Sequence, residues 1–445
     1  MIQAIIFILS TMVAALVFSR KYKVLPVCAL ILFLFTLDYT NYYFNIGSSV
    51  SGYLVKLYIE ILFVFSSLRY IAHAAKSKKA KKIALLILLF AIAFLIVGIA
   101  KNGALNAILD WRSSILPIAL AFLLVHSNIL DHRTTRKAIE FFCLLTILNS
   151  MLAIYQYSSF DGNAESSWRY NFLIDARQNN ESNTEERFVN YQIVRDDKLR
   201  ASGIFVSALQ YSYIAAMAAF YLFLKLFLEQ RKKLLMRAIY TAAFMVLSAG
   251  IVVSQVRASL MILAICIAAF FFFVKRTKRS IVFDIKKSAF LIVSSYALIL
   301  FVLFFYGGNA LDSSAAGRAP QYLKAISEFT IVGAGLGKYR GQFDSYFVYG
   351  TMTFGIAFFM IPFVYSRLFS SAFRPAPRLP EYEIIIIFAF GISISAAIIS
   401  LFQHLSGSVY YYMTWILLVI SANLVRRKSD QAIEVNYLNN RLPRP

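Results

Sequence analysis

Apolar runs of roughly 17–25 residues recur along the chain, each long enough as a helix to cross a hydrocarbon core about 30 Å thick. Short charged clusters separate the runs. The 445 residues are 60% hydrophobic, whereas a soluble domain rarely exceeds about half apolar residues. A transmembrane β-barrel would show alternating segments of about ten residues instead, and the sequence does not contain them. The pattern therefore predicts an all-α, polytopic transmembrane helical bundle.

We expect about 12–14 spans, because that number of apolar runs has the length of a membrane-crossing helix. The runs are residues 2–18, 24–38, 54–70, 83–100, 113–128, 138–156, 204–224, 238–255, 258–274, 288–305, 345–366, 383–402 and 408–425. They divide the chain into a six-span N-terminal region (1–156), a first long loop (157–203), a central transmembrane region (204–305), a second long loop (306–344), a C-terminal transmembrane region (345–425) and a tail (426–445).

The stretch over residues 238–274 is too long for a single span. A helix of that length would reach roughly 55 Å at 1.5 Å per residue, which is well beyond the hydrocarbon core. The chain must therefore turn near Ser254–Ser259. Arg257, the isolated cation of this stretch, is then expected at a membrane surface and not at the midplane.

Basic residues cluster in every second segment between the spans. These segments, which hold most of the 45 lysine and arginine residues, are 20–23, 69–82, 133–137, 225–237, 275–287, 367–378 and the tail from 426. By the positive-inside rule they are cytoplasmic, so the N-terminus is expected outside and the C-terminus inside. The alternation accounts for most of the net charge of +23 as a topology signal. We therefore do not expect nucleic acid as a partner.

The three cysteines predict neither a disulfide framework nor a metal site. Cys28, Cys143 and Cys266 all lie inside apolar runs, where cysteine behaves as a small core residue. No His/Cys/Asp cluster has the spacing of metal ligands. Residues 2–18 lack a basic start and a small-residue cleavage site, so we expect a retained span and not a cleaved signal peptide.

The second long loop contains a recognisable helix and a glycine-rich turn. Pro320 suits a first helical position, and the residues after it put apolar side chains on one face at helical spacing: Tyr322, Leu323, Ile326 and Phe329. We expect a short amphipathic helix at the outer membrane interface. The following "GAGLGKYRG" is not a nucleotide-binding loop, because Tyr339 stands where that motif needs Ser or Thr.

Cations and aromatic residues gather on the predicted outer face. The cations are Arg200, Arg257, Arg318, Lys338 and Arg340. Guanidinium groups match phosphate oxygens in pairs of hydrogen bonds, so this set favours a lipid-linked phosphate or pyrophosphate. The aromatic residues Tyr211, Tyr339 and Tyr346 are candidates for stacking on sugar rings. An interfacial aromatic belt is the alternative for the aromatic residues, and an arginine that reaches to the headgroups is the alternative for Arg257.

Four stretches resemble the bacterial O-antigen polymerase (Wzy) and O-antigen ligase superfamily of the inner membrane. They are "RASGIFVSALQYSYIAA", "VVSQVRASLMILAI", "GRAPQYLKAISEFTIVGAGLGKY" and "DSYFVYGTMTFGI". The resemblance covers roughly residues 200–360. Ligases of the superfamily typically show His-Asn where this chain has Asp344-Ser345, so the resemblance favours the polymerase branch.

The resemblance implies a GT-C-like membrane glycosyltransferase with two long periplasmic loops that contain short helices. It implies the joining of undecaprenyl-pyrophosphate-linked oligosaccharide repeat units on the periplasmic face of the inner membrane. Neither a nucleotide sugar, a cofactor nor a metal is expected. The expected partners are lipid-linked glycans, membrane lipid and a protein that regulates chain length. An O-antigen ligase, or a flippase of lipid-linked oligosaccharide, is the alternative.

On this hypothesis Arg257 and Arg318 hold the donor pyrophosphate, and Arg200 supports them. Asp344 is the first candidate for a general base on the acceptor hydroxyl, and capping of the following helix is its alternative role. The other candidate bases are His404, Asp312 and Glu328. Asp110 and Arg112 are expected either to line the outer cavity or to anchor the end of a span. Lys56 and Glu60, four residues apart on one helix face, are expected to neutralise each other within the bilayer.

Overall fold

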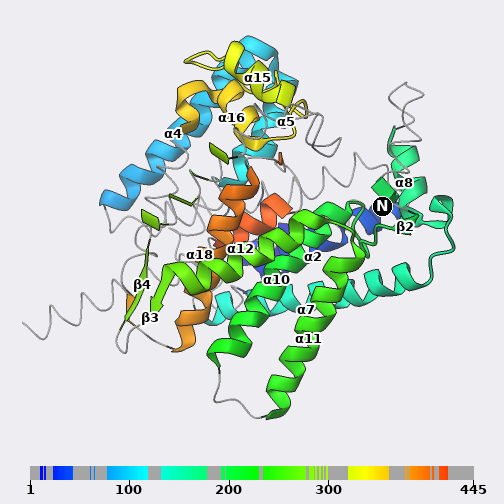
Figure 1. The fold of residues 1–445 in the computed structure, drawn as a ribbon. Helices are drawn as coiled ribbons and strands as arrows, with labels where there is room; N and C mark the ends of the chain where they lie inside the picture. Colours follow the sequence, from blue (N-terminus) through cyan, green and yellow to red (C-terminus); the bar gives the residue numbers. More distant parts are fainter. Residues whose placement is uncertain are drawn as a thin grey trace, which may run out of the picture. The chain divides into compact units, whose positions relative to one another are not determined.

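The computed structural model describes residues 24–43, 78–118, 132–177, 192–195, 197–229, 234–276, 280–284, 319–359, 376–377, 380–400, 403–404 and 410–418, with one to three residues at a time between 11 and 16, 61 and 65, and 286 and 298. These residues are mostly helical (Figure 1). They form two compact units, each discontinuous in sequence. The first comprises Met1–Arg69 and His132–Ile267, and the second Tyr70–Asp131 and Ala268–Pro445.

Four described helices are long and apolar enough to cross a membrane: Thr135–Ser158, Ala208–Leu228, Leu234–Val253 and Glu383–Ser400. Each coincides with a predicted span. Shorter apolar helices cover Val24–Thr36, Leu89–Asn102, Arg257–Phe273 and Tyr346–Phe358. The prediction of a helical protein with membrane-spanning segments is confirmed at this level. Most of the predicted spans 2–18, 54–70, 113–128 and 288–305, and the whole tail, lie outside the described residues.

In the first unit, α10 (Ala208–Leu228) packs against α7 (His132–Ser158) and α11 (Leu234–Val253), and α7 also packs against α2 (Val24–Tyr43). The three green and cyan helices α7, α10 and α11 are visible in Figure 1. Tyr211 on α10 is fully buried and donates a 2.8 Å hydrogen bond to the Ser150 hydroxyl on α7. A Cβ at Gly250 of α11 would lie 2.2 Å from the Tyr211 hydroxyl oxygen. The close approach of α11 to α10 therefore requires glycine there.

The predicted turn between two apolar helices is confirmed. Helix α11 ends at Val253, and α12 (Arg257–Phe273) begins after three residues. Gln255 takes a positive φ of 56°, which few residues other than glycine adopt. The hydroxyls of Ser254 and Ser259 donate to the carbonyls of Ile251 and Val256, which satisfies buried polar groups on both sides of the turn. Arg257 is the first residue of α12.

The first long loop contains several short helical and strand elements. They are a 3-10 turn η3 (Ala164–Ser166), a helix α8 (Trp168–Arg177) and a two-stranded antiparallel hairpin of β1 (Val194–Arg195) and β2 (Lys198–Leu199). The sequence analysis did not predict the hairpin. Its strands are two residues long, and such short strands have no periodicity that a sequence reading can detect.

The second unit contains α4 (Lys78–Asn102), α5 (Ala104–Ser114), α15 (Ala319–Ser327), α16 (Tyr346–Phe354) and α18 (Pro380–Ser400). Buried side chains of α5, α16 and the glycine-rich segment form one core, which includes Ala107, Leu336 and Val348. Helix α16 covers only the first part of the predicted span 345–366. It ends at Phe354, and its C-cap Gly355, whose φ is 57°, begins the 3-10 helix η4 (Gly355–Phe359).

Several contacts within each unit join segments that the alternation of basic residues predicts on the same side of the membrane. In the first unit, Lys225 is paired with Glu140 at 3.1 Å, at the basic ends of α10 and α7. In the second, β3 (Val274–Arg276), β4 (Ser280–Phe283) and β5 (Ala376–Pro377) form an antiparallel sheet from two basic segments. Asp110 of α5 accepts a hydrogen bond from the Gly337 N–H of the second long loop.

Candidate functional site

Two of the predicted site arginines belong to segments that meet at the turn between α11 and α12. The backbone N–H of Ala201, next to Arg200, donates a 3.1 Å hydrogen bond to the carbonyl of Val253, the last residue of α11. Arg257 begins α12 after this turn and is exposed. It forms no ion pair with any residue that the structure describes. The N-terminus of a helix carries partial positive charge, so this junction attracts anions.

Polar side chains of α7 hold the chain segment that follows Arg200. The Asn149 amide donates to the Ser202 carbonyl at 3.1 Å and accepts from the Ile204 N–H at 2.8 Å. Gln156 binds both the carbonyl and the N–H of Gly203, at 3.0 and 2.9 Å. Gly203 has a φ of 64°, and a Cβ there would lie 2.1 Å from Asn149 Oδ1. The glycine in the "RASG" stretch is therefore required by this packing.

Arg169, on α8, is a buried arginine whose role the sequence analysis missed. It is 2% exposed, and its guanidinium donates to the backbone carbonyls of Val206 at 2.7 Å, of Gln192 at 3.0 Å and of Arg200. In the sequence it is one of several loop arginines, and no spacing distinguishes it. Its hydrogen bonds fix the backbone at Arg200 and so support that side of the junction.

Asp110 is the centre of the polar contacts in the second unit. Its carboxylate is 1% exposed and accepts hydrogen bonds from the Tyr349 hydroxyl at 2.7 Å and the Gly337 N–H at 2.8 Å. Burial raises the pKa of Asp110, while these two hydrogen bonds and the positive charge of Arg340 oppose the shift. Asp110 therefore connects α5 to α16 and to the glycine-rich segment. From the sequence it was expected only to line the outer cavity or anchor a span.

The glycine-rich segment 333–341 is packed onto the junction of α4 and α5. The Lys101 ammonium donates to the Gly333 carbonyl at 3.0 Å, and the Asn102 amide donates to two further carbonyls of the segment. Gly337 has a φ of 96°, and a Cβ there would lie 2.9 Å from the Ala107 backbone nitrogen. The glycines thus allow a close approach of protein backbone. The segment leaves Lys338 and Arg340 exposed.

Asp344 and His404 lie next to each other at the start of α16. Asp344 is exposed, and the Gln321 amide donates to its Oδ2 at 3.1 Å and accepts from its backbone N–H at 2.8 Å. The N-cap of α16 is Ser345, whose hydroxyl accepts from Val348 N–H at 3.3 Å. The alternative role of Asp344 as the cap is therefore wrong, and its carboxylate remains accessible.

The His404 ring stacks on Tyr349 with 4.3 Å between the ring centroids, and its Nδ1 lies 3.1 Å from the Phe343 carbonyl. Burial lowers the pKa of His404 from 6.5 to about 4, against the opposing influence of that carbonyl and of the Asp344 charge. The ring is neutral at physiological pH. It is a weaker candidate for the base than Asp344, because its accessible nitrogen has little affinity for a proton at that pH.

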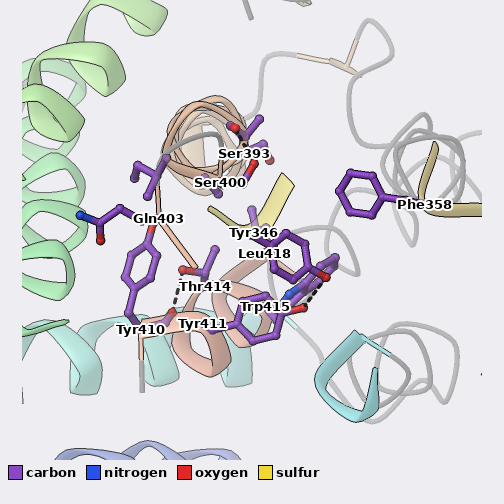
Figure 2. Close-up of a pocket in the computed structure, with 13 residues that line it drawn as sticks. Tyr346, Phe358, Ser393, Ser400, Gln403, Tyr410, Tyr411, Thr414, Trp415 and Leu418 are labelled. Atoms are coloured by element: carbon purple, nitrogen blue, oxygen red, sulfur yellow. Dashed lines mark hydrogen bonds between the residues drawn. The ribbon is translucent and has the colours of Figure 1, made fainter. Parts of the chain in front are cut away.

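The three candidate glycan-binding tyrosines have different surroundings. Tyr346 lines a cavity of about 220 Å³ between α16, α18 and the helical residues 410–418 (Figure 2). Its hydroxyl lies 3.4 Å from that of Tyr411. Tyr339 lines a second cavity, of about 880 Å³. Tyr211 is fully buried in the helix packing of the first unit, so its assignment to glycan binding is wrong and we remove it.

The remaining predicted residues divide into three groups. Arg318, Asp312, Lys56 and Glu60 lie outside the described residues. Glu328 lines the larger cavity, and its Oε2 accepts from the Tyr339 hydroxyl at 3.5 Å. Arg112 belongs to α5, where its carbonyl accepts from Tyr412 at 3.1 Å. Among the described side chains, no group of three His, Cys, Asp or Glu residues could hold a metal ion.

The described part of the chain thus offers two chemically distinct sites. An exposed cation at a helix start suits an anion, and an accessible carboxylate beside aromatic rings suits a hydroxylated ligand. No protein-family model matches this chain, and no curated protein matches it.

Proposed function

We propose that this chain is an O-antigen (surface polysaccharide) polymerase. It joins undecaprenyl-pyrophosphate-linked oligosaccharide repeat units on the periplasmic face of the bacterial inner membrane. The growing glycan leaves its lipid pyrophosphate and is transferred to a sugar hydroxyl of the next lipid-linked unit. The reaction needs no nucleotide sugar, because the bond to the lipid pyrophosphate is already activated.

The observation that carries the proposal is the state of Arg257. It is an exposed guanidinium, without an ion-pair partner among the described residues, at the first position of α12. The segment after Arg200 is bonded to the end of α11 at the same turn. A pyrophosphate leaving group develops negative charge, and cations that are already in position lower the barrier to its departure. Arg318 remains assigned to the same pyrophosphate on the resemblance.

Asp344 is assigned as the general base. A base must be accessible to the acceptor hydroxyl and must be held in a defined orientation. Asp344 is exposed, and its two hydrogen bonds with Gln321 fix both its carboxylate and its backbone. Tyr346, two residues after Asp344, lines a cavity of the same unit. Its aromatic ring offers a face on which a sugar ring can stack.

The proposed fold is GT-C-like, with periplasmic long loops, a periplasmic N-terminus and a cytoplasmic C-terminus. The alternation of basic segments supports this orientation, as do the contacts that join segments of one predicted side. A membrane protein that regulates chain length is a proposed partner, because the reaction by itself sets no end point for chain growth.

The direct test uses the purified full-length protein in detergent with undecaprenyl-pyrophosphate-linked repeat units as the only substrate. The products are separated by size and identified by mass spectrometry. We expect a ladder of lipid-linked glycans that differ by one repeat unit. Detergent removes the two sides of the membrane, so a flippase would give no ladder but would move the same lipid across vesicles. Transfer to an added lipid A core acceptor, without a ladder, would instead identify a ligase.

A further inference from the structure

Helix α15 turns its apolar residues outward. The sequence pattern put Tyr322, Leu323, Ile326 and Phe329 on one face. In the structure Tyr322 is buried and its hydroxyl donates to Ser345 at 3.2 Å, whereas Leu323, Ile326 and Phe329 are 51%, 62% and 43% exposed. The exposed apolar surface continues into the next segment through Ile331 and Val332, at 69% and 67%. We call these five exposed residues, 323, 326, 329, 331 and 332, the apolar stripe.

The apolar stripe runs into the larger cavity of the second unit. This cavity of about 880 Å³ is lined by Lys101, Asn102, Glu328, Thr330, Ile331, Val332, Gly333, Ala334, Lys338, Tyr339 and Met352. Ile331 and Val332 therefore belong to both the stripe and the cavity wall. Helices α4, α15 and α16, which surround this region, appear together in Figure 1.

The cavity wall also carries two ammonium groups. Lys101 uses one proton for its 3.0 Å hydrogen bond to the Gly333 carbonyl and has two more to donate. Lys338 is exposed, with its nitrogen 5.2 Å from the centroid of the Tyr339 ring. One carboxylate, Glu328, also lines the cavity and is turned to the Tyr339 hydroxyl at 3.5 Å. Two ammonium groups and one carboxylate thus line the cavity, whose lining has a net positive charge.

We propose that this cavity binds the pyrophosphate head of a prenyl-type lipid, with the first isoprene units of the lipid lying along the apolar stripe. The assignment rests on the proposed function for the identity of the lipid. Lysine binds phosphate as a point charge. A hydrocarbon chain that lies along the stripe covers its exposed apolar side chains, which favours the complex. The site holds a lipid-linked substrate at α15, and no bond is made or broken in it.

The juxtaposition of charge and apolar surface is what favours this ligand. A helix that only anchors in the interface needs an apolar face, which Leu323 and Ile326 supply. It does not need two ammonium groups in a cavity that opens onto the same face. A soluble phosphate ester would use the lysines and leave the stripe uncovered. An amphiphile with an anionic head uses both.

The test measures binding to the full-length protein in detergent, in an Arg257→Ala background so that the pyrophosphate site proposed there is removed. Farnesyl pyrophosphate, farnesol and inorganic pyrophosphate are titrated separately by calorimetry. We expect farnesyl pyrophosphate to bind more tightly than either fragment. Lys338→Gln should weaken its binding about tenfold, and Lys101→Gln with Lys338→Gln by more. Lys324→Gln is the matched control, because Lys324 is an exposed lysine of α15 outside the cavity wall.

A second pair of variants tests the stripe. Ile331→Ser with Val332→Ser should weaken binding of farnesyl pyrophosphate about tenfold and leave that of inorganic pyrophosphate unchanged. The proposal would be overturned if Lys338→Gln and Lys324→Gln proteins, both of unchanged melting temperature, bound farnesyl pyrophosphate equally well. It would also be overturned if the Ile331→Ser, Val332→Ser variant bound farnesyl pyrophosphate as the parent protein does. Displacement of farnesyl pyrophosphate by an equal concentration of phosphatidylglycerol would also overturn it, since the site would then accept any anionic lipid.

The outcome is separable from that of the proposed function. If purified wild-type protein makes the ladder but the lysine variants bind farnesyl pyrophosphate normally, the polymerase assignment stands and this site is wrong. If the lysine and serine variants lose binding as expected but wild-type protein makes no ladder, the lipid site stands and the polymerase assignment is wrong.

Discussion

The Tyr349 hydroxyl donates a 2.7 Å hydrogen bond to Oδ1 of Asp110, a residue 239 positions earlier in the chain. The second carboxylate oxygen of Asp110 accepts from the Gly337 N–H. One buried carboxylate thus connects α5, α16 and the glycine-rich segment. The position of Lys338, which follows Gly337 directly, and of Arg340, three residues after Gly337, depends on this connection.

Tyr349→Phe should lower the free energy of unfolding by about 1–3 kcal/mol, because it leaves a buried carboxylate oxygen without its donor. Denaturation of the purified protein in detergent measures the change. Tyr155→Phe is the control, since Tyr155 is 66% exposed and a surface substitution usually changes stability by less than about 0.5 kcal/mol. Equal stability of the two variants would show that the Asp110 contact contributes nothing.

Gly203→Ala should destabilise the first unit more than Gly162→Ala does. Both glycines have positive φ, at 64° and 87°, so both variants carry the cost of about 1 kcal/mol for a left-handed residue with a side chain. Only at Gly203 would the new Cβ meet another group, the Asn149 amide at 2.1 Å, while nothing lies within 4 Å at Gly162. The difference between their midpoints of unfolding isolates the clash. A difference of zero would contradict the described packing of Gly203 on α7.

Stability should fall as the pH drops from about 6.5 toward 4, through His404. Its pKa in the folded protein is lowered to about 4, so within this window the unfolded state binds a proton that the folded state does not. The full effect is about 3–3.5 kcal/mol by linkage, since each pKa unit corresponds to about 1.4 kcal/mol. Melting temperatures across the pH range measure it.

His404→Gln provides the control for this prediction. Asp110, whose pKa is raised, acts in the opposite sense: the folded state keeps its proton where the unfolded state has lost it, so its contribution falls as the pH rises. Asp110 is present in both proteins, so its contribution cancels when the melting temperature of His404→Gln is subtracted from that of the wild type at each pH. A difference that is independent of pH would mean that His404 is not held in its neutral form.

Arg257→Ala should reduce chain growth by about 100-fold, the typical effect of removing one preorganised group from a developing anion. Arg237→Ala is the matched control, because Arg237 is another exposed arginine of the same helix pair, near the start of α11. It should polymerise at the wild-type rate. Both rates are measured with purified protein and lipid-linked repeat units. Normal polymerisation by Arg257→Ala would remove this residue from the mechanism.

Asp344→Asn should reduce chain growth at least 100-fold while the protein keeps its melting temperature, because the amide cannot accept the proton of the acceptor hydroxyl. The backbone N–H of residue 344 remains in place, so its hydrogen bond to Gln321 Oε1 is kept. Asp161→Asn, at an exposed carboxylate of the first loop that bonds Ser166 and Asn163, controls for the loss of one negative charge. A fully active Asp344→Asn protein would exclude Asp344 as the base.

The sequence alone indicated the helical membrane class, the four described helices long enough to cross a membrane and the break in the chain before Arg257. These follow from the length and the periodicity of apolar runs, which are local properties and need no knowledge of what packs against what. The glycine-rich turn was also predicted, since glycine at short spacing indicates positive φ whatever the surroundings.

Only the tertiary structure decided what each polar residue does. Partners between 23 and 239 positions away give Asp110, Arg169 and Gly203 their roles. Two other candidate site residues of the sequence differ in the fold: Tyr211 is a core residue, and Asp344 is an exposed carboxylate. Long-range contacts of this kind arise from packing between helices, which leaves no periodic trace in either partner's own sequence. The membrane class is therefore a property of the sequence, whereas the site is a property of the fold.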